Sequence, residues 1–449
     1  MKLISQYGVK ILHYNSIFKR TVEIYRKAVD FFIEVCLAEW DRFSDLKHPQ
    51  QSTAIMENLT IATAKRPVVS YDFASADKTF YKMPCYLRRN AIAEACGKVC
   101  SYKSNLANRE AGDPATRGAK PSYPKAGFIY PVLYKNNMYS PTDNPYAFKI
   151  KAYIRNTWDW ITVNVRKSDI DYIIRHCADR KQLSPTLQKR GKAWSLDFGF
   201  KEDVKLTDMP VNQQTVVAVD LGINSVCTCS VMTSDGTILG RRFLKLPREY
   251  DSLYHTLNKI KKVQRLGARN PKTLWARAKG LNDRISVLTA QFIVDTAVLY
   301  NADAIVMEHL DLQRKKRGSK KQRLALWRAK YVQSMVTHKA HHNGIRVSHV
   351  NAWGTSRLAY DGSGRVLRGK EAELGSYSVC KFQSGKTYNC DLNATYNIGA
   401  RYFIRELLKS LSVTARLDVE AKVPQCSKRS TCTLSTLISF HAVLMETAS

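Results

Sequence analysis

The spacing of apolar residues changes along the chain, and each change marks a different kind of element. Residues 1–14 contain a short apolar run that predicts an opening strand. Apolar residues then recur at helical spacing and predict one helix over about 15–40 and another over about 87–106. Together these two helices predict a small helical region with basic residues on its outer surface.

A stretch rich in Gly, Pro and Ala at 107–125 interrupts this pattern, and we interpret it as a linker or exposed loop. A candidate strand covers 128–134. Apolar residues alternate with polar ones around 161–165 and again over 194–200, which predicts further strands. Several short antiparallel strands in this region predict a small β-barrel that ends near residue 210.

From Thr215 onward, buried strands and long helices are expected, and residues 412–449 carry a weak pattern that predicts a loosely ordered tail. The predicted fold class is therefore α+β and multidomain. The expected elements after Thr215 are strands at 215–220, 225–232, 238–246, 304–307 and 345–350, a helical stretch at about 251–300, an irregular Gly-rich stretch at 353–390, and a helix from 391 to about 411.

Three of these elements carry an acid at one end. Asp220 ends the strand VVAVD, Glu308 ends the strand AIVME, and Asp391 opens the last helix. Adjacent strands would place the first two acids at one edge of a sheet, and the helix would bring the third across that edge. Taken singly, each acid has a structural alternative, as a solvated residue at a strand end or, for Asp391, as a helix N-cap.

Three converging acids repel one another unless cations lie between them. Two Mg²⁺ ions would satisfy such a cluster, because Mg²⁺ prefers oxygen ligands, and they would activate a water against a phosphodiester. The sequence therefore predicts a magnesium-dependent phosphodiester hydrolase with catalytic and metal-binding residues Asp220, Glu308 and Asp391.

The charge of the chain indicates its partner. Lys and Arg total 71 against 38 Asp and Glu, which gives a net charge of +33. Such an excess repels itself unless a polyanion neutralises it, so nucleic acid is the expected partner. No stretch approaches the roughly 20 apolar residues that span a bilayer, and the N-terminal sequence lacks a signal-peptide core, so we expect a cytoplasmic protein without a membrane partner. Its 11 cysteines are odd in number and scattered, which indicates reduced thiols.

Candidate nucleic-acid contacts are basic and aromatic side chains on the predicted helices, together with the basic run at 314–323. We interpret that run as a mobile lid over the predicted active-site cleft, with a solvated loop as the alternative. For the candidates on the predicted helices, the alternative is that they are ordinary surface residues without a binding role. The candidates are Arg88, Arg89, Tyr102, Lys103, Lys261, Lys262, Arg265, Arg314, Lys315, Lys316 and Arg317.

Three segments, taken in order, resemble a known family. AVDLGIN around Asp220, IVMEHLDL around Glu308 and CDLNATYNIGAR around Asp391 resemble the three split RuvC motifs of TnpB-type transposon nucleases and compact type V CRISPR effectors. Residues 83–104 resemble the recognition-lobe helix of that family, and residues 125–205 resemble its wedge barrel. The resemblance covers roughly residues 1–411, and the ordered set of motifs is specific, whereas each motif alone is weak.

The resemblance implies an RNA-guided DNA endonuclease of the prokaryotic cytoplasm, associated with the nucleoid, whose partners are a guide RNA and target DNA. Asn393 and Asn397 are expected either to support Asp391 or to serve the helix structurally. The implied order is the opening wedge strand at 1–14, a helical recognition lobe at 15–106, a linker at 107–124, the wedge barrel at 125–210, an RNase H-like RuvC domain at 215–352 and 389–411, a target-nucleic-acid-binding loop at 353–388, and the tail at 412–449.

One departure from the family concerns zinc. Members usually carry a four-cysteine zinc ribbon before the third acid, but here Cys380 remains alone, Ser384 stands at a cysteine position and Cys390 is out of register. Two cysteines do not close a tetrahedral zinc site, so we predict no structural zinc. Aromatic packing is expected to hold the loop instead, through Tyr360, Tyr377, Phe382 and Tyr388.

Two other functions remain open. One is an RNA-guided repressor that binds DNA without cleaving it, against which the intact set of acids argues. The other is an unguided, structure-specific RuvC nuclease, which would not need the large basic region before Thr215. Transposon and CRISPR contexts, and a monomer or a homodimer, are also alternatives.

Overall fold

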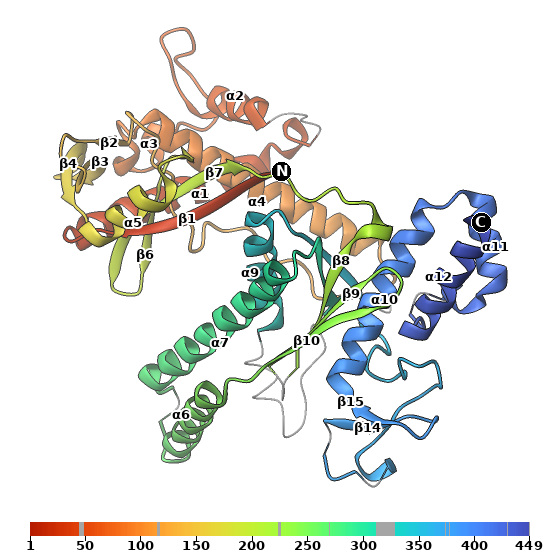
Figure 1. The fold of residues 1–449 in the computed structure, drawn as a ribbon. Coiled ribbons are helices and arrows are strands. Elements are labelled where there is room, and N and C mark those ends of the chain that lie inside the picture. The colour runs from red at the N-terminus through yellow and green to blue at the C-terminus, as the bar shows by residue number, and fades with distance from the viewer. Residues whose placement is uncertain are drawn as a thin grey trace. The chain divides into compact units, whose positions relative to one another are not determined.

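The computed structural model describes residues 1–44, 49–114, 117–222, 226–268, 270–310, 328–372, 374–376, 378–428 and 430–448. The chain divides into two compact units, Lys2–Glu202 and Asp203–Ser449, the latter together with Met1 (Figure 1). In the described ranges, no helix is both long enough and apolar enough to cross a membrane.

Two long helices pack against each other in the first unit, α1 (Asn15–Ala38) and α4 (Cys85–Ala111). Both predicted helices are confirmed, although α4 extends into the expected linker. Phe18, Val22 and Tyr25 begin the buried stripe of α1, at the three- and four-residue spacing that places side chains on one helix face. The pattern did not predict the shorter helices, which are α2 (Pro49–Thr60), α3 (Phe73–Ala76) and α5 (Lys167–Cys177).

Two small sheets complete the first unit. One has the order β1-β7-β5 with β6 also paired to β7, and the other has the order β2-β3-β4. The strands are β1 (Lys2–Lys10), β2 (Tyr139–Pro141), β3 (Ala147–Ile154), β4 (Thr157–Asn164), β5 (Lys181–Gln182), β6 (Thr186–Arg190) and β7 (Ala193–Asp203).

The predicted closed β-barrel is wrong for the described residues. Isolated bridges join Ile11 to Val165 and Val132 to Thr186, but the two sheets do not close on each other. The candidate strand at 128–134 makes only the bridge at Val132, next to Pro131, which lacks the backbone N–H that a ladder requires. The first unit is therefore a mixed arrangement of helices and open sheets.

A five-stranded sheet with the order β10-β9-β8-β11-β12 forms the centre of the second unit. The first three strands along the chain pair antiparallel, and β11 runs parallel to both β8 and β12. All five predicted strands are confirmed, as β8 (Thr215–Asp220), β9 (Cys227–Thr233), β10 (Ile238–Leu244), β11 (Ala304–His309) and β12 (Arg346–Asn351).

Helices cover both faces of this sheet. Val216 and Ala218 belong to a core that includes Tyr396 of α10 (Cys390–Ser410), whereas Val217 and Val219 belong to a core with α7 (Lys272–Leu299) and α9 (Ala329–His342). Successive strand residues point to opposite faces, so both sets are buried and the strand reads as a continuous apolar run.

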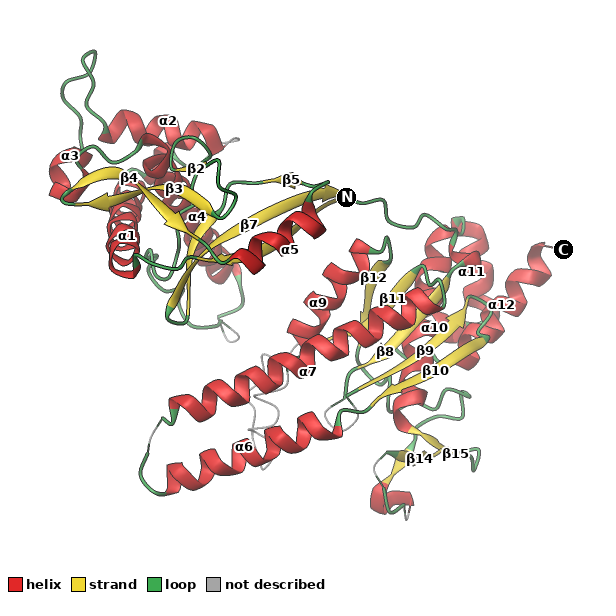
Figure 2. Cartoon of the chain, turned by 60° about the vertical axis from the view of Figure 1, so that its left-hand side comes forward, coloured by secondary structure: helices red, strands yellow, loops and turns green. Residues whose placement is uncertain are grey.

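The helical stretch predicted over 251–300 is two helices rather than one. The first, α6 (Pro247–Arg265), lies beside α7 as an antiparallel pair (Figure 2). Gly267 adopts a positive φ of 96° just after α6, and Pro271 directly precedes α7. A left-handed glycine ends a helix and a proline suits the start of one, so the sequence did contain the signal for this break.

The expectation of a loosely ordered tail is wrong for residues 412–428 and 430–448. This part of the chain forms α11 (Val413–Lys422) and α12 (Leu434–Ala448), and α12 packs against α10. Buried tail residues join the core on the α10 side of the sheet, among them Val419, Cys426, Leu437 and Phe440. The tail is therefore part of the second unit.

Candidate active site and nucleic-acid contacts

The pairing of β8 with β11 brings the first two predicted acids together. Val219 pairs with Met307 in the parallel register, so Asp220 and Glu308 follow at neighbouring positions of adjacent strands. In parallel strands such residues stand at the same edge of the sheet. Both side chains are half-buried there.

The third acid comes from the helix that covers this sheet. Asp391 lies in the first turn of α10, which packs against β8, β9, β11 and β12. The N-cap is Asn389, whose side chain accepts hydrogen bonds from the backbone N–H groups of Asp391 and Leu392, both at 3.0 Å. The capping role that the sequence left open for Asp391 therefore belongs to Asn389.

Asp220 is the acid on which the charges of the other two act. Burial raises the pKa of Asp220 well above its ordinary value of 3.8, and the negative charges of Glu308 and Asp391 raise it further. The positive charge of Arg368, which the sequence did not single out, opposes this shift. Because charge–charge energy falls with distance, these effects place all three acids in one neighbourhood.

Glu308 is held by contacts that the sequence did not predict. The Thr355 hydroxyl donates a hydrogen bond to Oε1 of Glu308, and the side-chain amide of Gln333 donates to the Glu308 backbone carbonyl at 2.7 Å. Burial raises the pKa of Glu308, against the effects of the Thr355 hydrogen bond and the charge of Arg401. No local pattern pointed to Thr355, which lies 47 positions along the chain from Glu308.

The two asparagines of α10 serve the segment after β12 rather than Asp391. Asn393 accepts from the backbone N–H of Tyr360 at 2.8 Å and donates to the Leu358 carbonyl at 2.9 Å. Asn397 donates to the carbonyls of Thr355 and Leu358, both at 2.9 Å. Of the two roles expected for these residues, the structure shows the structural one.

In the described part of the chain, no group of three or more His, Cys, Asp or Glu residues has the arrangement of a metal-ligand cluster. The donor chemistry nevertheless suits a divalent cation. Three carboxylates supply the hard oxygen ligands that Mg²⁺ prefers, and burial together with the charges of Glu308 and Asp391 raises the pKa of Asp220.

The predicted loop before Asp391 contains a small sheet of β13 (Leu367–Arg368), β14 (Val379–Lys381) and β15 (Thr387–Asn389). The expected aromatic packing is confirmed for three of its four members, since the ring of Tyr360 lies 5.4 Å from that of Phe382 and 5.1 Å from that of Tyr388. Tyr377 lies outside the described residues. Cys380 and Cys390 are buried free thiols.

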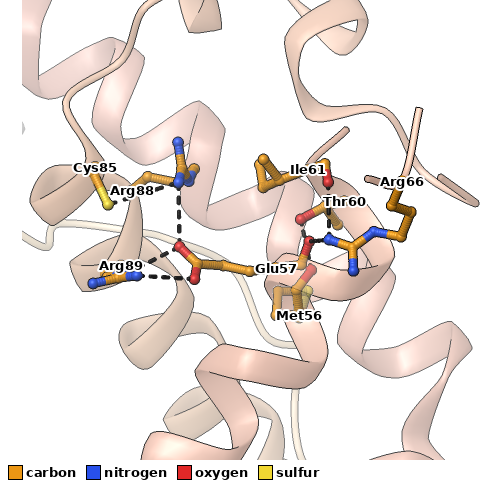
Figure 3. A network of polar contacts seen from close by, with 8 residues as sticks. All are labelled: Met56, Glu57, Thr60, Ile61, Arg66, Cys85, Arg88 and Arg89. Carbon is orange, nitrogen blue, oxygen red and sulfur yellow. Dashed lines mark hydrogen bonds and ion pairs between the residues drawn. The ribbon is translucent and has the colours of Figure 1, made fainter. Parts of the chain in front are cut away.

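Arg88 and Arg89 hold a carboxylate of their own unit. Arg88 Nη2 lies 3.2 Å from Oε1 of Glu57, and Arg89 Nε lies 3.1 Å from the same oxygen (Figure 3). Burial raises the pKa of Glu57, but the hydrogen bonds from Arg89 and Arg88 outweigh it and leave the pKa lowered. These ion pairs give both arginines a structural role, and their binding role stays a prediction.

The remaining candidates lie in several places. Tyr102 lines a groove of about 1160 Å³ along α4, with its ring 6.2 Å from that of Tyr123. The Lys103 ammonium lies 5.3 Å from the centre of the Trp40 ring. Three basic residues are exposed on α6, namely Lys261, Lys262 and Arg265, and four lie outside the described residues, namely Arg314, Lys315, Lys316 and Arg317.

Sequence comparisons find relatives for the N-terminal region. Residues 5–154 match the model of the Aq_aa04 family, a stretch shorter than half of the chain. The uncharacterized protein aq_aa04 of Aquifex aeolicus (strain VF5) is 29% identical over 126 residues, which cover 26% of this chain and 69% of that protein. Neither match carries a functional description.

Comparisons with solved structures cover most of the chain. The mini-RNA-guided endonuclease CRISPR-Cas_phi3 superposes with a TM-score of 0.52 at 9% identity, over 89% of this chain and 92% of that one. Cas12f1, in a complex with single-guide RNA and target DNA, gives a TM-score of 0.34 at 14% identity, over 88% and 98% of the two chains. The first superposition shows that this chain shares the fold of CRISPR-Cas_phi3.

Proposed function

We propose that this protein is an RNA-guided DNA endonuclease that hydrolyses target DNA, and that Asp220, Glu308 and Asp391 are its catalytic residues. The observation that carries the proposal is the placement of Asp220 and Glu308 at neighbouring positions of parallel strands, with Asp391 in the first turn of the helix that packs on both strands. The net charge of +33 suits a nucleic-acid substrate, and the fold shared with CRISPR-Cas_phi3 supports an RNA-guided nuclease.

The proposed division of labour follows the two units. The second unit would be the RuvC nuclease domain, a role supported by its sheet of three antiparallel strands extended by two parallel ones. The first unit would bind the guide RNA and the DNA next to the target, using the helical lobe around α1 and α4 and the open wedge sheets. The loop at 353–388 would contact target nucleic acid without zinc.

In this proposal Asp220, Glu308 and Asp391 would hold two Mg²⁺ ions. When bound, the ions would supply an activated water and neutralise charge that develops on the scissile phosphate. The protein's own residues position these acids. The β8–β11 register fixes the spacing of Asp220 and Glu308, and the N-cap at Asn389 fixes the first turn of α10.

The test is cleavage of DNA by the full chain with the small RNA that copurifies with it, Mg²⁺ and a matching target. Cleavage that requires RNA and is lost in Asp220→Ala supports the proposal. The matched control is Asp235→Asn, in the turn at the opposite end of β9, which should cleave at the parental rate. Binding without cleavage would indicate an RNA-guided repressor, and cleavage without RNA would indicate an unguided nuclease.

A further inference from the structure

The side chain that contacts Glu308 comes from an irregular segment after β12, in which Thr355 itself is buried. Thr355 follows β12, is 2% exposed, and donates its hydroxyl hydrogen to Oε1 of Glu308. The same hydroxyl lies 3.2 Å from the Ala352 carbonyl, its other possible acceptor. A carboxylate is the stronger acceptor, so the hydrogen is committed to Glu308.

The segment around Thr355 has no regular structure of its own, and α10 fixes it from one face. Asn393, Asn397 and Arg401 are spaced four residues apart, so they stand on the same side of the helix. All three are buried, and each bonds to backbone groups between residues 351 and 360. The position of Thr355 is therefore set by the helix that also carries Asp391.

Arg401 completes this support. Its Nη1 donates to the carbonyls of Asn351 at 2.9 Å and Trp353 at 2.7 Å, and its Nε donates to the Cys432 carbonyl at 3.1 Å. Asn397 in turn accepts from the backbone N–H of Leu434 at 3.3 Å. The helical tail thereby braces the same row of α10 side chains that holds the Thr355 segment.

From these contacts we propose that Thr355 is the positioning residue of Glu308, holding one carboxylate oxygen so that the other is presented to a divalent cation shared with Asp220 and Asp391. Without this donor, the Glu308 side chain would occupy several rotamers, and only some of them would face the other acids. The inference rests on the proposed function in one respect, that these acids bind a divalent cation. It concerns cation binding and not the choice of nucleic acid.

The test measures Mn²⁺ binding to the full chain by titration calorimetry, without RNA or DNA. Thr355→Val keeps the size of the side chain and removes the donor, and we expect the dissociation constant to rise about 10- to 100-fold, as for other groups that orient metal ligands. Thr355→Ser restores the hydroxyl and should bind Mn²⁺ within about threefold of the parent, on the same reasoning.

Thr289→Val is the matched control. Thr289 is also 2% exposed, and its hydroxyl donates at 2.7 Å to the Ile285 carbonyl within α7, a helix that carries none of the three acids. This variant should lower the unfolding temperature about as much as Thr355→Val does and leave Mn²⁺ binding unchanged. A purely structural role for Thr355 predicts that both valine variants behave alike in both measurements.

The proposal is overturned if Thr355→Val binds Mn²⁺ as tightly as the parent, if Thr355→Ser is as weak as Thr355→Val, or if the parent binds no Mn²⁺ at these acids. A parent protein that binds Mn²⁺ at Asp220 but cuts no DNA under any condition would contradict the proposed function alone. The two failures are therefore distinguishable.

Discussion

Two charged clusters, one in each unit, handle their charge in opposite ways. In the first unit, Arg88 and Arg89 neutralise Glu57, and its pKa falls. In the second unit, burial and the charges of two more carboxylates raise the pKa of Asp220. A charge that neighbouring residues neutralise is part of the protein's own structure. A charge that neighbouring residues do not neutralise marks a place where a ligand supplies the opposite charge.

The largest expected effect comes from removing one negative charge from the cluster of Asp220, Glu308 and Asp391. Glu308→Gln keeps the acceptor for Thr355 and removes the negative charge, so the fold should persist while cleavage falls by about 10³-fold or more. Single-turnover cleavage of target DNA, with DNA binding measured in parallel, checks this. Cleavage at the parental rate would mean that Glu308 is an ordinary strand-end residue.

The same Glu-to-Gln substitution at Glu57, whose charge is neutralised, should lower stability and leave cleavage unchanged. Glu57→Gln leaves Arg88 and Arg89 without a negatively charged partner, and we expect the free energy of unfolding to fall by about 1.5–3 kcal/mol, the usual contribution of hydrogen bonds to charged groups. Urea denaturation measures the loss. Cleavage at 25 °C should stay near the parental rate, and a parental stability would show that the ion pairs contribute nothing.

The acids should also make the metal-free protein sensitive to pH. A raised pKa means that the folded state binds the proton of Asp220 more tightly than the unfolded chain does. The contribution of this group to stability is therefore complete below its ordinary value of 3.8 and is lost as the pH rises through the raised pKa. In EDTA, Asp220→Asn should be more stable than the parent by about 0.5–2 kcal/mol at pH 7.

At pH 3 this difference should vanish, because the parental side chain is then also neutral. Urea denaturation at both pH values checks this. An Asp220→Asn variant that is less stable than the parent at pH 7 would show that the negative charge of Asp220 is compensated after all.

The smallest expected effect is a difference in stability between variants of Arg88 and Arg89. The Arg88 side chain is 17% exposed and that of Arg89 is 48% exposed, so Arg89→Met should lower stability by less than about 1 kcal/mol, and by less than Arg88→Met does. Binding of guide RNA measured over a range of salt concentrations gives a second readout. If Arg89 binds a phosphate instead, its replacement would reduce the slope of log K against log salt by about 1.

The candidate site was predictable to the extent that local pattern encodes it. The strands before Asp220 and Glu308 are apolar because both sheet faces are covered, and the helix that Asp391 opens is buried along most of its length. The register that makes the two strands neighbours is long-range information that no local pattern contains. Their proximity was therefore an expectation that assumed adjacent strands, and the β8–β11 pairing now describes it.

The missed features share a physical cause. Glu57 lies on α2, whose apolar face is short, and it meets Arg88 across 31 positions of sequence. Thr355 lies in an irregular segment whose order depends on side chains of α10. Conversely, the order of the tail comes from packing against α10, which outweighs its weak periodic pattern. Partners distant in sequence, rather than propensities, decide these positions.

The central claim is that the three acids leave negative charge that a divalent cation neutralises. The most direct test is the thermal unfolding midpoint of the parent and of Asp220→Asn, each with EDTA and with Mg²⁺. We predict that Mg²⁺ raises the midpoint of the parent and leaves that of Asp220→Asn unchanged, because only the parent has the full set of ligands. An equal shift in both proteins, or no shift in either, would contradict the claim.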